Sequence, residues 1–542
     1  MLVKNSLNLI YEFFFITYKQ IRKLYLNSSI YNKKISKSDN INLSYKPTLG
    51  VLSCLIKYEK KKNKIEDFYI NEIWEAKNIS DLDYKKLHSF YWLFSIDLKS
   101  SKKITQSIIQ NWIKNNQKYK SKNWEIDTLS KRVIAWISNS KLTYDESNKI
   151  YKVQFNEIIN KQINHLINEI NRSELVDDKM IGCTAIIMTG LSYNHEKFLS
   201  YGLNLLKKII NSSFDSQYYP KSRNIRQLVF YLKYFVLIRE LLKESLNEIP
   251  EYLNEIIFYL GKAYNFSWRS IKESILFNGN NESDLSDFDK YLDLNKYKFK
   301  YNFNEMGGYS IINNKNVIIA MDTGSTPDRK FSENYQSGPL SFEIIYKGKK
   351  IICNSGYFQD HKHQLNQISK STAAHSTLII NNTSACTFKK NKLGQNIIDK
   401  GFKLFEKNII SEKNYFKIEG SHDGYSNKYG IVHRRILEFY PEKNTFIGKD
   451  KLIKKKNFKL SNFEIRFHLM PDTKVTKIQD NRSVLIELEN SGWKFYSSHG
   501  IIDIETGLYF GKKNNFVENK NIFISGISQK EEQIIEWEIT KI

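Results

Sequence analysis

The sequence predicts a multidomain protein in which a helical N-terminal half is followed by a large antiparallel β-sandwich. Its 542 residues are more than one hydrophobic core usually organises. From about residue 70 to residue 275, apolar residues recur at helical spacing. After about residue 301, short β-rich segments alternate with turn residues. The change of period places the domain boundary near residues 278–299.

The helical half shows its period clearly in Ile108, Trp112 and Ile113. The polar breaks between such runs are short, which favours antiparallel helix pairs arranged as a toroid or a solenoid. The most apolar stretch, residues 228–242, contains Lys233 and is too short to cross a bilayer comfortably. We therefore expect a buried helix there.

The β-rich half follows a polar, acidic stretch at residues 278–299 that is typical of a linker. Lys347-Gly348-Lys349 separates two apolar runs and predicts a hairpin turn. We expect no helix in this half. The predicted strands lie at residues 317–321, 340–346, 351–353, 377–380, 436–440, 484–488, 493–496, 522–524 and 534–539.

The formal net charge of +25 and the pI near 9.4 predict a surface that attracts anions such as acidic polysaccharide, nucleic acid or anionic lipid. The lysines are spread along the whole chain, and no nucleic-acid-binding signature is present. Charge is thus the only feature that favours a nucleic-acid or membrane-surface binder.

The cysteines and the N-terminus exclude several further classes. The four cysteines, Cys54, Cys183, Cys353 and Cys386, lie far apart and lack C-x-x-C spacing, so neither a zinc finger nor a disulfide framework is expected. The apolar run at residues 7–18 contains a glutamate, and no small-residue cleavage site follows it. We expect an amphipathic helix there, no secretory signal peptide, and no transmembrane helix.

The densest motifs lie in the β-rich half. G-P-L-S-F-E at residues 338–343 is followed by C-N-S-G at residues 353–356 and by S-T-A-A-H-S-T-L at residues 371–378. H-R-R at residues 433–435 and F-E-I-R-F-H-L at residues 463–469 come next. In this order the motifs resemble the C-terminal domain of heparinase II/III-like proteins.

The helical half is similar to the same family in Trp124, Arg132 and Trp136, and in Arg223-Asn224 ahead of the apolar helix. The resemblance implies an N-terminal α/α toroid, which is an incomplete helical barrel, joined to an antiparallel β-sandwich. It divides the chain into an N-terminal, partly helical segment at residues 1–69, the toroid at 70–277, a linker at 278–299 and the sandwich at 300–542.

The resemblance also implies a polysaccharide lyase that acts by β-elimination on an acidic, uronate-containing polysaccharide of the cell envelope or an exopolysaccharide. Such a reaction removes the proton at C5 of the uronate and expels the 4-oxygen. It needs a group that neutralises the carboxylate, a base for the proton and an acid for the leaving oxygen.

Several positions that carry this chemistry in the family are changed in this sequence. The Tyr-His pair of active members corresponds to Gln227 and Leu228, and an earlier Asn-His pair corresponds to Asp178 and Lys179. Lys179 can still neutralise a carboxylate. His375 belongs to the most specific motif, although a histidine that only bonds to backbone would fit it equally well. The candidate catalytic residues are His375, Gln227, Lys179 and His433.

The candidate substrate-binding residues have a cationic, imidazole or amide side chain within the family motifs. They are Arg223, Asn224, Gln336, Asn354, Arg434, Arg435, Arg466 and His468. Arg466 and His468 alternate with apolar residues, so both lie on one face of a strand, where burial against a polar partner is an equal expectation. Glu343 is either a core partner for an arginine or a site carboxylate.

Metal-containing members of the family offer H-x-H before the L-S-F-E strand, an aspartate in the turn and the later histidine. Here Asn334, Gln336 and Asn354 stand in the first three places, and only His375 remains. Amides are poor zinc ligands beside imidazole and carboxylate, so we expect no zinc and no other cofactor. A second H-x-H run at residues 361–363 lies in a polar loop, where we expect solvent exposure.

Three functions stay open on the sequence alone. The first is a carbon-oxygen lyase acting on polysaccharide, or a glycoside hydrolase on the same scaffold. The second is a non-catalytic binder of acidic polysaccharide, which the amides at Gln227, Gln336 and Asn354 favour. The third, a nucleic-acid or anionic-membrane binder, rests on charge. The family implies the cell envelope or periplasm, the N-terminus leaves the cytoplasm open, and the sequence does not indicate an oligomeric state.

Overall fold

The computed structural model describes residues 14, 17–37, 42–48, 52, 74, 79–96, 102–392, 394–478, 481–499, 502–512, 515–529 and 532–542. It divides into two compact units. The helical unit contains the chain up to Ser212 together with Lys233–Glu255, and the β unit contains Ser213–Leu232 together with Ile256–Ile542. Helices α11 (Ile225–Glu244) and α12 (Glu251–Tyr264) contribute residues to both.

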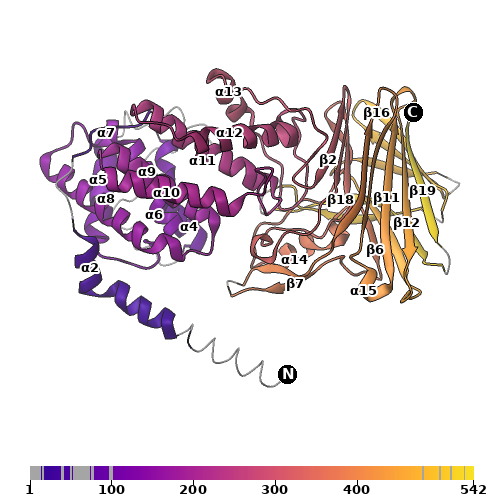
Figure 1. Ribbon diagram of the computed structural model, residues 1–542, viewed down its shortest axis with the longest axis horizontal. Coiled ribbons are helices and arrows are strands. Elements are labelled where there is room, and N and C mark those ends of the chain that lie inside the picture. The colour runs from indigo at the N-terminus through magenta and orange to yellow at the C-terminus, as the bar shows by residue number, and fades with distance from the viewer. Residues whose placement is uncertain are drawn as a thin grey trace. The chain divides into compact units, whose positions relative to one another are not determined.

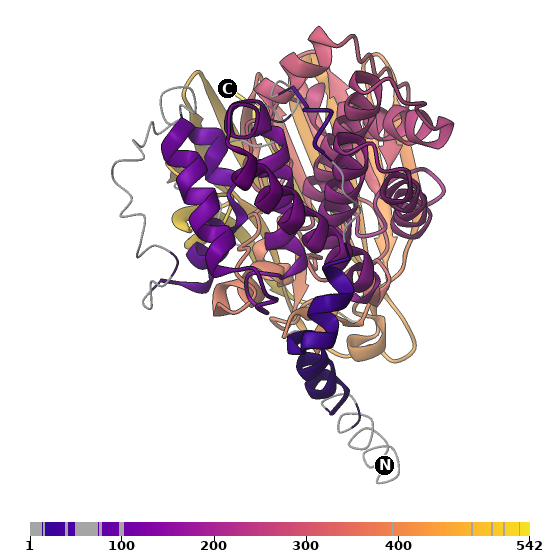
Figure 2. The same cartoon turned by 90° about the vertical axis from the view of Figure 1, so that its left-hand side faces the viewer.

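Helices in the helical unit run side by side (Figures 1 and 2). Their apolar side chains are buried in the core. Its further helical segments are residues 17–27, α2 (Ser29–Ile35), α4 (Asp81–Ser89), α5 (Lys102–Asn115), α6 (Ile126–Ser138), α7 (Ser140–Thr143), α8 (Lys149–Glu169), α9 (Val176–Ser192) and α10 (Glu196–Ser213). Helix α6 packs against α4, α8 and α9. The apolar stretch at residues 228–242 is a largely buried part of α11, as predicted. Among the described residues, no helix is long and apolar enough to cross a membrane.

Arg132, one of the residues in the helical motif, is fully buried in α6 and serves the fold of the helical unit. It donates hydrogen bonds to Gln162 Oε1 at 3.2 Å, to the carbonyl of His88 at 2.9 Å and to the carbonyl of Asn123 at 2.9 Å. Burial lowers the pKa of Arg132 to about 9. Trp124 and Trp136 of the same motif are also buried, so their rings pack in the core and are not exposed for sugar stacking.

The sheets of the β unit are antiparallel, and buried and more exposed side chains alternate along several of their strands. One sheet contains β1 (Glu305–Met306), β2 (Tyr309–Asn314), β3 (Val317–Asp322), β4 (Phe342–Tyr346) and β5 (Lys349–Ile352). A second runs in the order β14 (Lys474–Lys477), β15 (Ser483–Leu488), β16 (Ser491–Ser497), β19 (Gln533–Lys541), β12 (Thr445–Lys454), β11 (Ile431–Tyr440), β10 (Phe416–His422) and β9 (Leu404–Ser411). A third sheet runs in the order β17 (Ile502–Tyr509), β18 (Val517–Ile527), β13 (Asn462–His468) and β6 (Leu378–Ile380). A fourth pairs β7 (Thr387–Lys390) with β8 (Asn396–Lys400).

All four sheets contribute residues to one hydrophobic core. The ring of Trp537 from β19 stacks on Phe342 of β4 at 5.2 Å and meets Phe467 of β13 at 4.9 Å. The predicted sandwich is therefore confirmed. The predicted hairpin joins β4 to β5, and the positive φ angles of Lys347 (47°) and Gly348 (76°) fit a tight two-residue turn.

The structure adds two details to the pattern expected for the β-rich half. Two short helices, α14 (Gln364–Lys370) and α15 (Ser426–Tyr429), lie in connections between strands where we expected no helix. The stretch expected to be a linker carries α13 (Ser286–Leu294) and buried asparagines. Asn281, for example, donates to the carbonyls of Tyr357 and Phe510, so a polar composition here satisfies buried backbone groups. Most of the apolar run at residues 7–18, and Cys54, lie outside the described residues.

Candidate functional site

Gln336 and Asn354, two of the predicted site residues, are fully buried, and their amides are occupied by protein groups. Gln336 accepts the N–H of Gly279 at 2.8 Å and donates to the carbonyls of Gly356 at 2.9 Å and Ser369 at 2.6 Å. Asn354 accepts the N–H of Ser376 at 2.9 Å and donates to Glu343 Oε1 at 3.2 Å. Both amides therefore tie loops of the β unit together.

This arrangement does not fit a zinc ion. The side-chain oxygens of Gln336 and Asn354 each already accept a backbone N–H, and His375 is the single imidazole of the family's ligand set. A structural zinc site normally needs four good ligands. That the protein binds no zinc stays a prediction, and we assign no chemistry to a metal.

His375 is 1% exposed, and neither ring nitrogen has a hydrogen-bond partner among the described residues. The ring packs against Gly338, where a Cβ atom would lie 2.8 Å from His375 Cγ. Burial, with a smaller contribution from His468, lowers the pKa of His375 to about 3, so the imidazole is neutral at pH 7. Among the described residues, His375 therefore does not have the purely structural role of a histidine that bonds to the backbone.

The other histidine and arginine candidates in the β unit are held by protein partners. Arg223 pairs with Asp322, Arg434 with Glu419, Arg435 and His433 with Asp450, Arg466 with Glu464 and Glu505, and His468 with Ser355 and the carbonyl of Ala373. Glu343 faces the core, but its ion-pair partner is Lys350, at 2.8 Å, and not an arginine. Arg223, His433, Arg435 and His468 are buried, and their assignment to substrate or catalysis stays a prediction.

Lys179 lies half-buried in the first part of α9, in the helical unit. Its neighbour Asp178 is the residue there with unusual acid-base properties. Burial and the carboxylates of Asp127 and Asp177 raise the pKa of Asp178 to about 7. The pair thus contains a carboxyl group that titrates near neutral pH.

The start of α11 positions Gln227 and Arg226. Asn224 precedes the helix, and its side-chain oxygen accepts the N–H of Gln227 at 3.1 Å, as an N-cap does. The Gln227 side chain accepts a hydrogen bond from the hydroxyl of Ser222. Between these capping contacts lies Arg226, whose guanidinium carbon is 6.0 Å from the centre of the Tyr357 ring.

Arg226, Tyr357 and His361 form a group that we call the Arg226 cluster. The Tyr357 hydroxyl donates to Asn334 Oδ1 at 3.1 Å and accepts from Asn366 Nδ2 at 3.0 Å. The His361 ring lies 6.5 Å from the Tyr357 ring, and its buried Nδ1 has no hydrogen-bond partner among the described residues. The expectation that His361 is simply solvent-exposed is therefore wrong.

The imidazole of His361 and the phenol of Tyr357 are both neutral at pH 7. Burial, followed by the charges of Lys370 and Arg226, lowers the pKa of His361 to about 4, and burial raises the pKa of Tyr357. A neutral imidazole has a free lone pair and is able to accept a proton, although its lowered pKa makes it a weaker base until an anion approaches. The sequence offered one signal for Tyr357, its place directly after the C-N-S-G turn, and none for the burial of His361.

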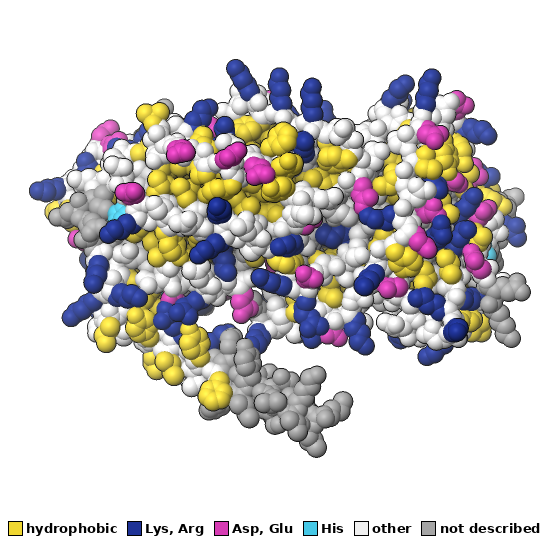
Figure 3. Space-filling model, viewed as in Figure 1, with side chains coloured by type: hydrophobic (Ala, Val, Ile, Leu, Met, Phe, Trp, Pro, Cys, Tyr) yellow, Lys and Arg dark blue, Asp and Glu magenta, His cyan; other side chains and the backbone are white. Residues whose placement is uncertain are grey.

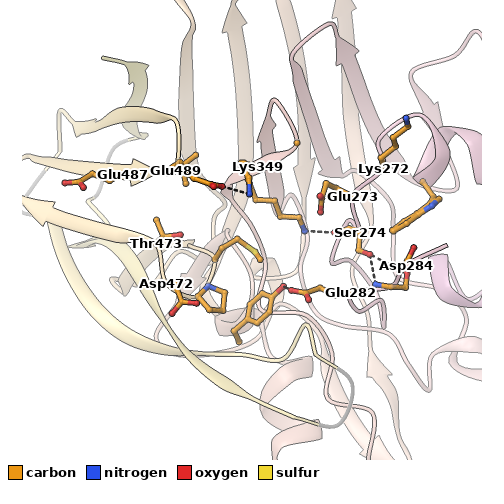
Figure 4. A pocket seen from close by; sticks show the side chains of 18 residues that line it. Lys272, Glu273, Ser274, Glu282, Asp284, Lys349, Asp472, Thr473, Glu487 and Glu489 are labelled. Atoms are coloured by element: carbon orange, nitrogen blue, oxygen red, sulfur yellow. Dashed lines mark hydrogen bonds and ion pairs between the residues drawn. The ribbon is translucent and has the colours of Figure 1, made fainter. Parts of the chain in front are cut away.

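The β unit also contains a cavity of about 800 Å³, apart from the Arg226 cluster, which is unsuited to a polyanion (Figure 4). Six carboxylates and three lysines line it. Lys349 is already paired with Glu489 at 2.9 Å, and Lys350 donates to the carbonyl of Ser274. Its excess of negative charge would repel an acidic polysaccharide.

Comparison with known proteins relates this geometry to a family and to solved structures. Residues 300–538 match the family model described as Heparinase II/III-like, C-terminal. FtsZ-localized protein C of Caulobacter vibrioides is 23% identical over 251 residues, which cover 43% of this chain and 42% of that relative. The match therefore spans less than half of the relative's length.

The solved structures share the fold over nearly the whole chain. Heparinase III superposes with a TM-score of 0.69 and 14% identity, covering 94% of this chain and 88% of that one. Heparan sulfate lyase HepC from Pedobacter heparinus superposes with a TM-score of 0.64 and 13% identity, covering 94% and 85%. The fold thus defines a polysaccharide lyase-type scaffold, with a helical N-terminal region and a sheet-rich C-terminal domain. Within that class, the C-terminal domain belongs to the heparinase II/III-like family.

Proposed function

We propose that this protein is a polysaccharide lyase that cleaves an acidic, uronate-containing polysaccharide of the cell envelope, or an exopolysaccharide, with the Arg226 cluster as its reactive group. The observation that carries the proposal is the grouping of the half-buried His361 and the cation of Arg226 around Tyr357, at 6.5 and 6.0 Å from the centre of its ring. The lyase-type scaffold supports the same class of reaction.

In this mechanism Arg226 neutralises the uronate carboxylate, which makes the proton at C5 more acidic. His361 accepts that proton as the C5–H bond breaks. The electrons form the C4–C5 double bond, and the C4–O bond breaks. The imidazolium returns its proton to the departing 4-oxygen when both lie on one face of the sugar. A substrate carboxylate beside His361 raises its pKa toward neutrality, which makes the imidazole a better base.

The charge of the surface supports an anionic substrate in a general way. Lysine and arginine side chains are spread over the visible face without forming one stripe (Figure 3). Such a distribution raises the local concentration of a polyanion but selects no particular site. Selectivity would therefore come from built sites such as the Arg226 cluster.

The test is an absorbance assay. Purified protein is incubated with a panel of acidic polysaccharides while absorbance is followed in the unsaturated-uronate band. We expect His361→Ala to lower the rate by a factor of about 100 or more, the usual contribution of a general base. His363→Ala is the matched control, because His363 lies in the same loop, is exposed, and accepts the N–H of Leu365 at the start of α14.

The second candidate function is binding of an acidic polysaccharide without catalysis. The buried hydrogen bonds of Gln336 and Asn354 favour it. These two residues hold the fold at positions where the family places metal ligands. If no polysaccharide in the panel yields absorbance while salt-sensitive binding is retained, the lyase proposal fails and the binder replaces it.

A further inference from the structure

A cavity of about 870 Å³ opens in the β unit among four loops that contain none of the predicted site residues. The loops follow β3, follow β6, join β8 to β9 and lead from β10 into α15, and residues 325–326, 383–387, 400–404 and 423–429 supply the lining. The volume lies within the range of about 300–1,000 Å³ that is usual for small-ligand sites. The cavity is large enough for a sugar unit.

Positive charge predominates in this cavity. Lys400, Lys403 and Lys428 line it against one carboxylate, Asp423. Asp423 Oδ1 accepts the backbone N–H of Lys403 at 2.8 Å, so this carboxylate is committed to fixing its loop. Among the described residues, no ion pair joins Lys400 or Lys403 to a carboxylate. The neighbouring carboxylate of Asp399 is paired with Lys389 and Arg329 instead. The lysine ammonium groups are therefore able to bind an anion.

The walls offer the other groups that recognise a sugar. The aromatic rings of Phe402, Tyr425 and Tyr429 border the cavity. The hydroxyls of Thr383 and Tyr429 lie 2.7 Å apart, and Lys428 donates to Thr383 Oγ1 at 3.2 Å. The three rings are largely buried and form the apolar part of the wall, whereas the hydroxyls are able to exchange hydrogen bonds with the polar groups of a sugar.

A buried chain of hydrogen bonds fixes the floor. The His422 ring contacts Phe402 and Tyr425 at centroid distances of 5.5 and 5.6 Å. Gly424 N–H donates to His422 Nδ1 at 3.2 Å, so His422 Nε2 carries its proton and donates to His433 Nδ1 at 3.1 Å. His433 Nε2 in turn donates to Asp450 Oδ1 at 2.6 Å. A floor held in this way loses little conformational entropy when a ligand binds.

We infer that this cavity binds a sugar unit bearing a carboxylate or sulfate group, as a second saccharide site that shares no residue with the Arg226 cluster. The choice of a sugar rests on the proposed function, whereas the preference for an anion follows from the three lysines. Such a site retains the polysaccharide that is being cleaved, or a neighbouring polysaccharide chain, while a segment at the Arg226 cluster is processed.

The test compares binding of an oligogalacturonate, a heparin oligosaccharide and a neutral cello-oligosaccharide to the full chain by calorimetry at two salt concentrations. The variant is Lys400→Gln with Lys403→Gln. The control, Lys455→Gln with Lys456→Gln, removes the same charge at exposed positions outside the cavity. Differential chemical labelling of lysines, read by mass spectrometry, locates the bound oligosaccharide independently.

We expect an acidic oligosaccharide to bind and the neutral one not to bind. The cavity variant should lose at least tenfold in affinity, with a log–log salt slope smaller by about 2, or about 1 for each lysine. The control should stay close to the wild type, and ligand should protect Lys400 and Lys403 from labelling. Equal affinity of cavity variant and control, equal binding of the neutral probe, or no binding of either acidic probe overturns the inference. Binding is measured without cleavage, so a failure of the lyase proposal is distinguishable.

Discussion

Asn334 and Gln336 stand where metal-containing members of the family have an H-x-H pair, and the change gives both side chains different roles. Gln336 bonds three backbone groups from separate loops. Asn334 accepts a hydrogen bond from Tyr357 and thereby belongs to the surroundings of the Arg226 cluster. An amide supplies both a donor and an acceptor, so Gln336 is able to bond several backbone groups at once. These hydrogen bonds hold the surrounding segments together.

This account predicts that zinc is not needed for the fold. Elemental analysis of the purified protein should find no stoichiometric zinc, and treatment with a chelator should leave the thermal midpoint unchanged. The reason is that Gln336 and Asn354 are poor ligands whose oxygens are already occupied. One zinc ion per chain, with a midpoint that falls when the metal is removed, would contradict the assignment.

The sequence predicted some of the residue-scale picture and could not predict the rest. It pointed to His375, Gln336 and Asn354 through family motifs, and the expectation of no zinc that it raised there stays a prediction. It gave no sign that His361 is half-buried, because the polar loop around it shows no apolar period. Nor could it identify Asp450 as the partner of Arg435, which lies on the neighbouring strand.

At the scale of elements, Asp450 of β12 links four neighbouring strands. It receives hydrogen bonds from His433 and Arg435 of β11 and from Trp537 of β19, and His433 is bonded to His422 of β10. The Arg435–Asp450 pair is completely buried. Burial alone would raise the pKa of Asp450, but Arg435 and His433 outweigh it and the net pKa lies below its ordinary value.

Asp450→Asn should therefore lower stability by about 3–5 kcal/mol at pH 7, because Arg435 is left as a buried charge without its counterion. The folded-state pKa of Asp450 lies below the value of about 3.9 for an unfolded chain. The contribution is thus present above about pH 4 and is lost as the pH falls further. Denaturation followed at several pH values should show the gap between wild type and variant closing in acid.

Glu518→Gln is a suitable control for this measurement, since Glu518 is an exposed carboxylate on β18. Its stability should match that of the wild type. A loss caused by Asp450→Asn that is no larger than that of the control, or that persists undiminished in acid, would show that the ion pair does not link the strands as described.

The strands themselves were the most predictable elements, because the two-residue period of β11 and β19 is visible in the sequence. The same period places His433 and Arg435 on the face of Leu437, which indicates burial. The short helices α14 and α15 were missed because a helix of four to seven residues has too few turns to show a period. The domain boundaries suggested by the family stay a prediction.

At the scale of the whole molecule, the fold supplies a polysaccharide lyase-type scaffold, and the β unit contains the two regions that we propose as sites for anionic sugars. One is the Arg226 cluster, with a neutral imidazole, and the other is the lysine-lined cavity next to α15. A lyase that holds its polymer at a second point would release long products slowly. This arrangement is consistent with a strongly basic chain, in which scattered lysines attract the polymer and built sites retain it.

The most direct test of the central claim is digestion of an acidic polysaccharide in oxygen-18-labelled water, with the products analysed by mass spectrometry. β-Elimination breaks the C4–O bond without adding water, so the account predicts shorter chains with unsaturated ends and no labelled oxygen beyond the slow solvent exchange of the reducing-end hydroxyl, which chains of the same length incubated without protein measure. These products should disappear with His361→Ala and persist with His363→Ala. Products that incorporate the label would contradict elimination and indicate hydrolysis on this scaffold.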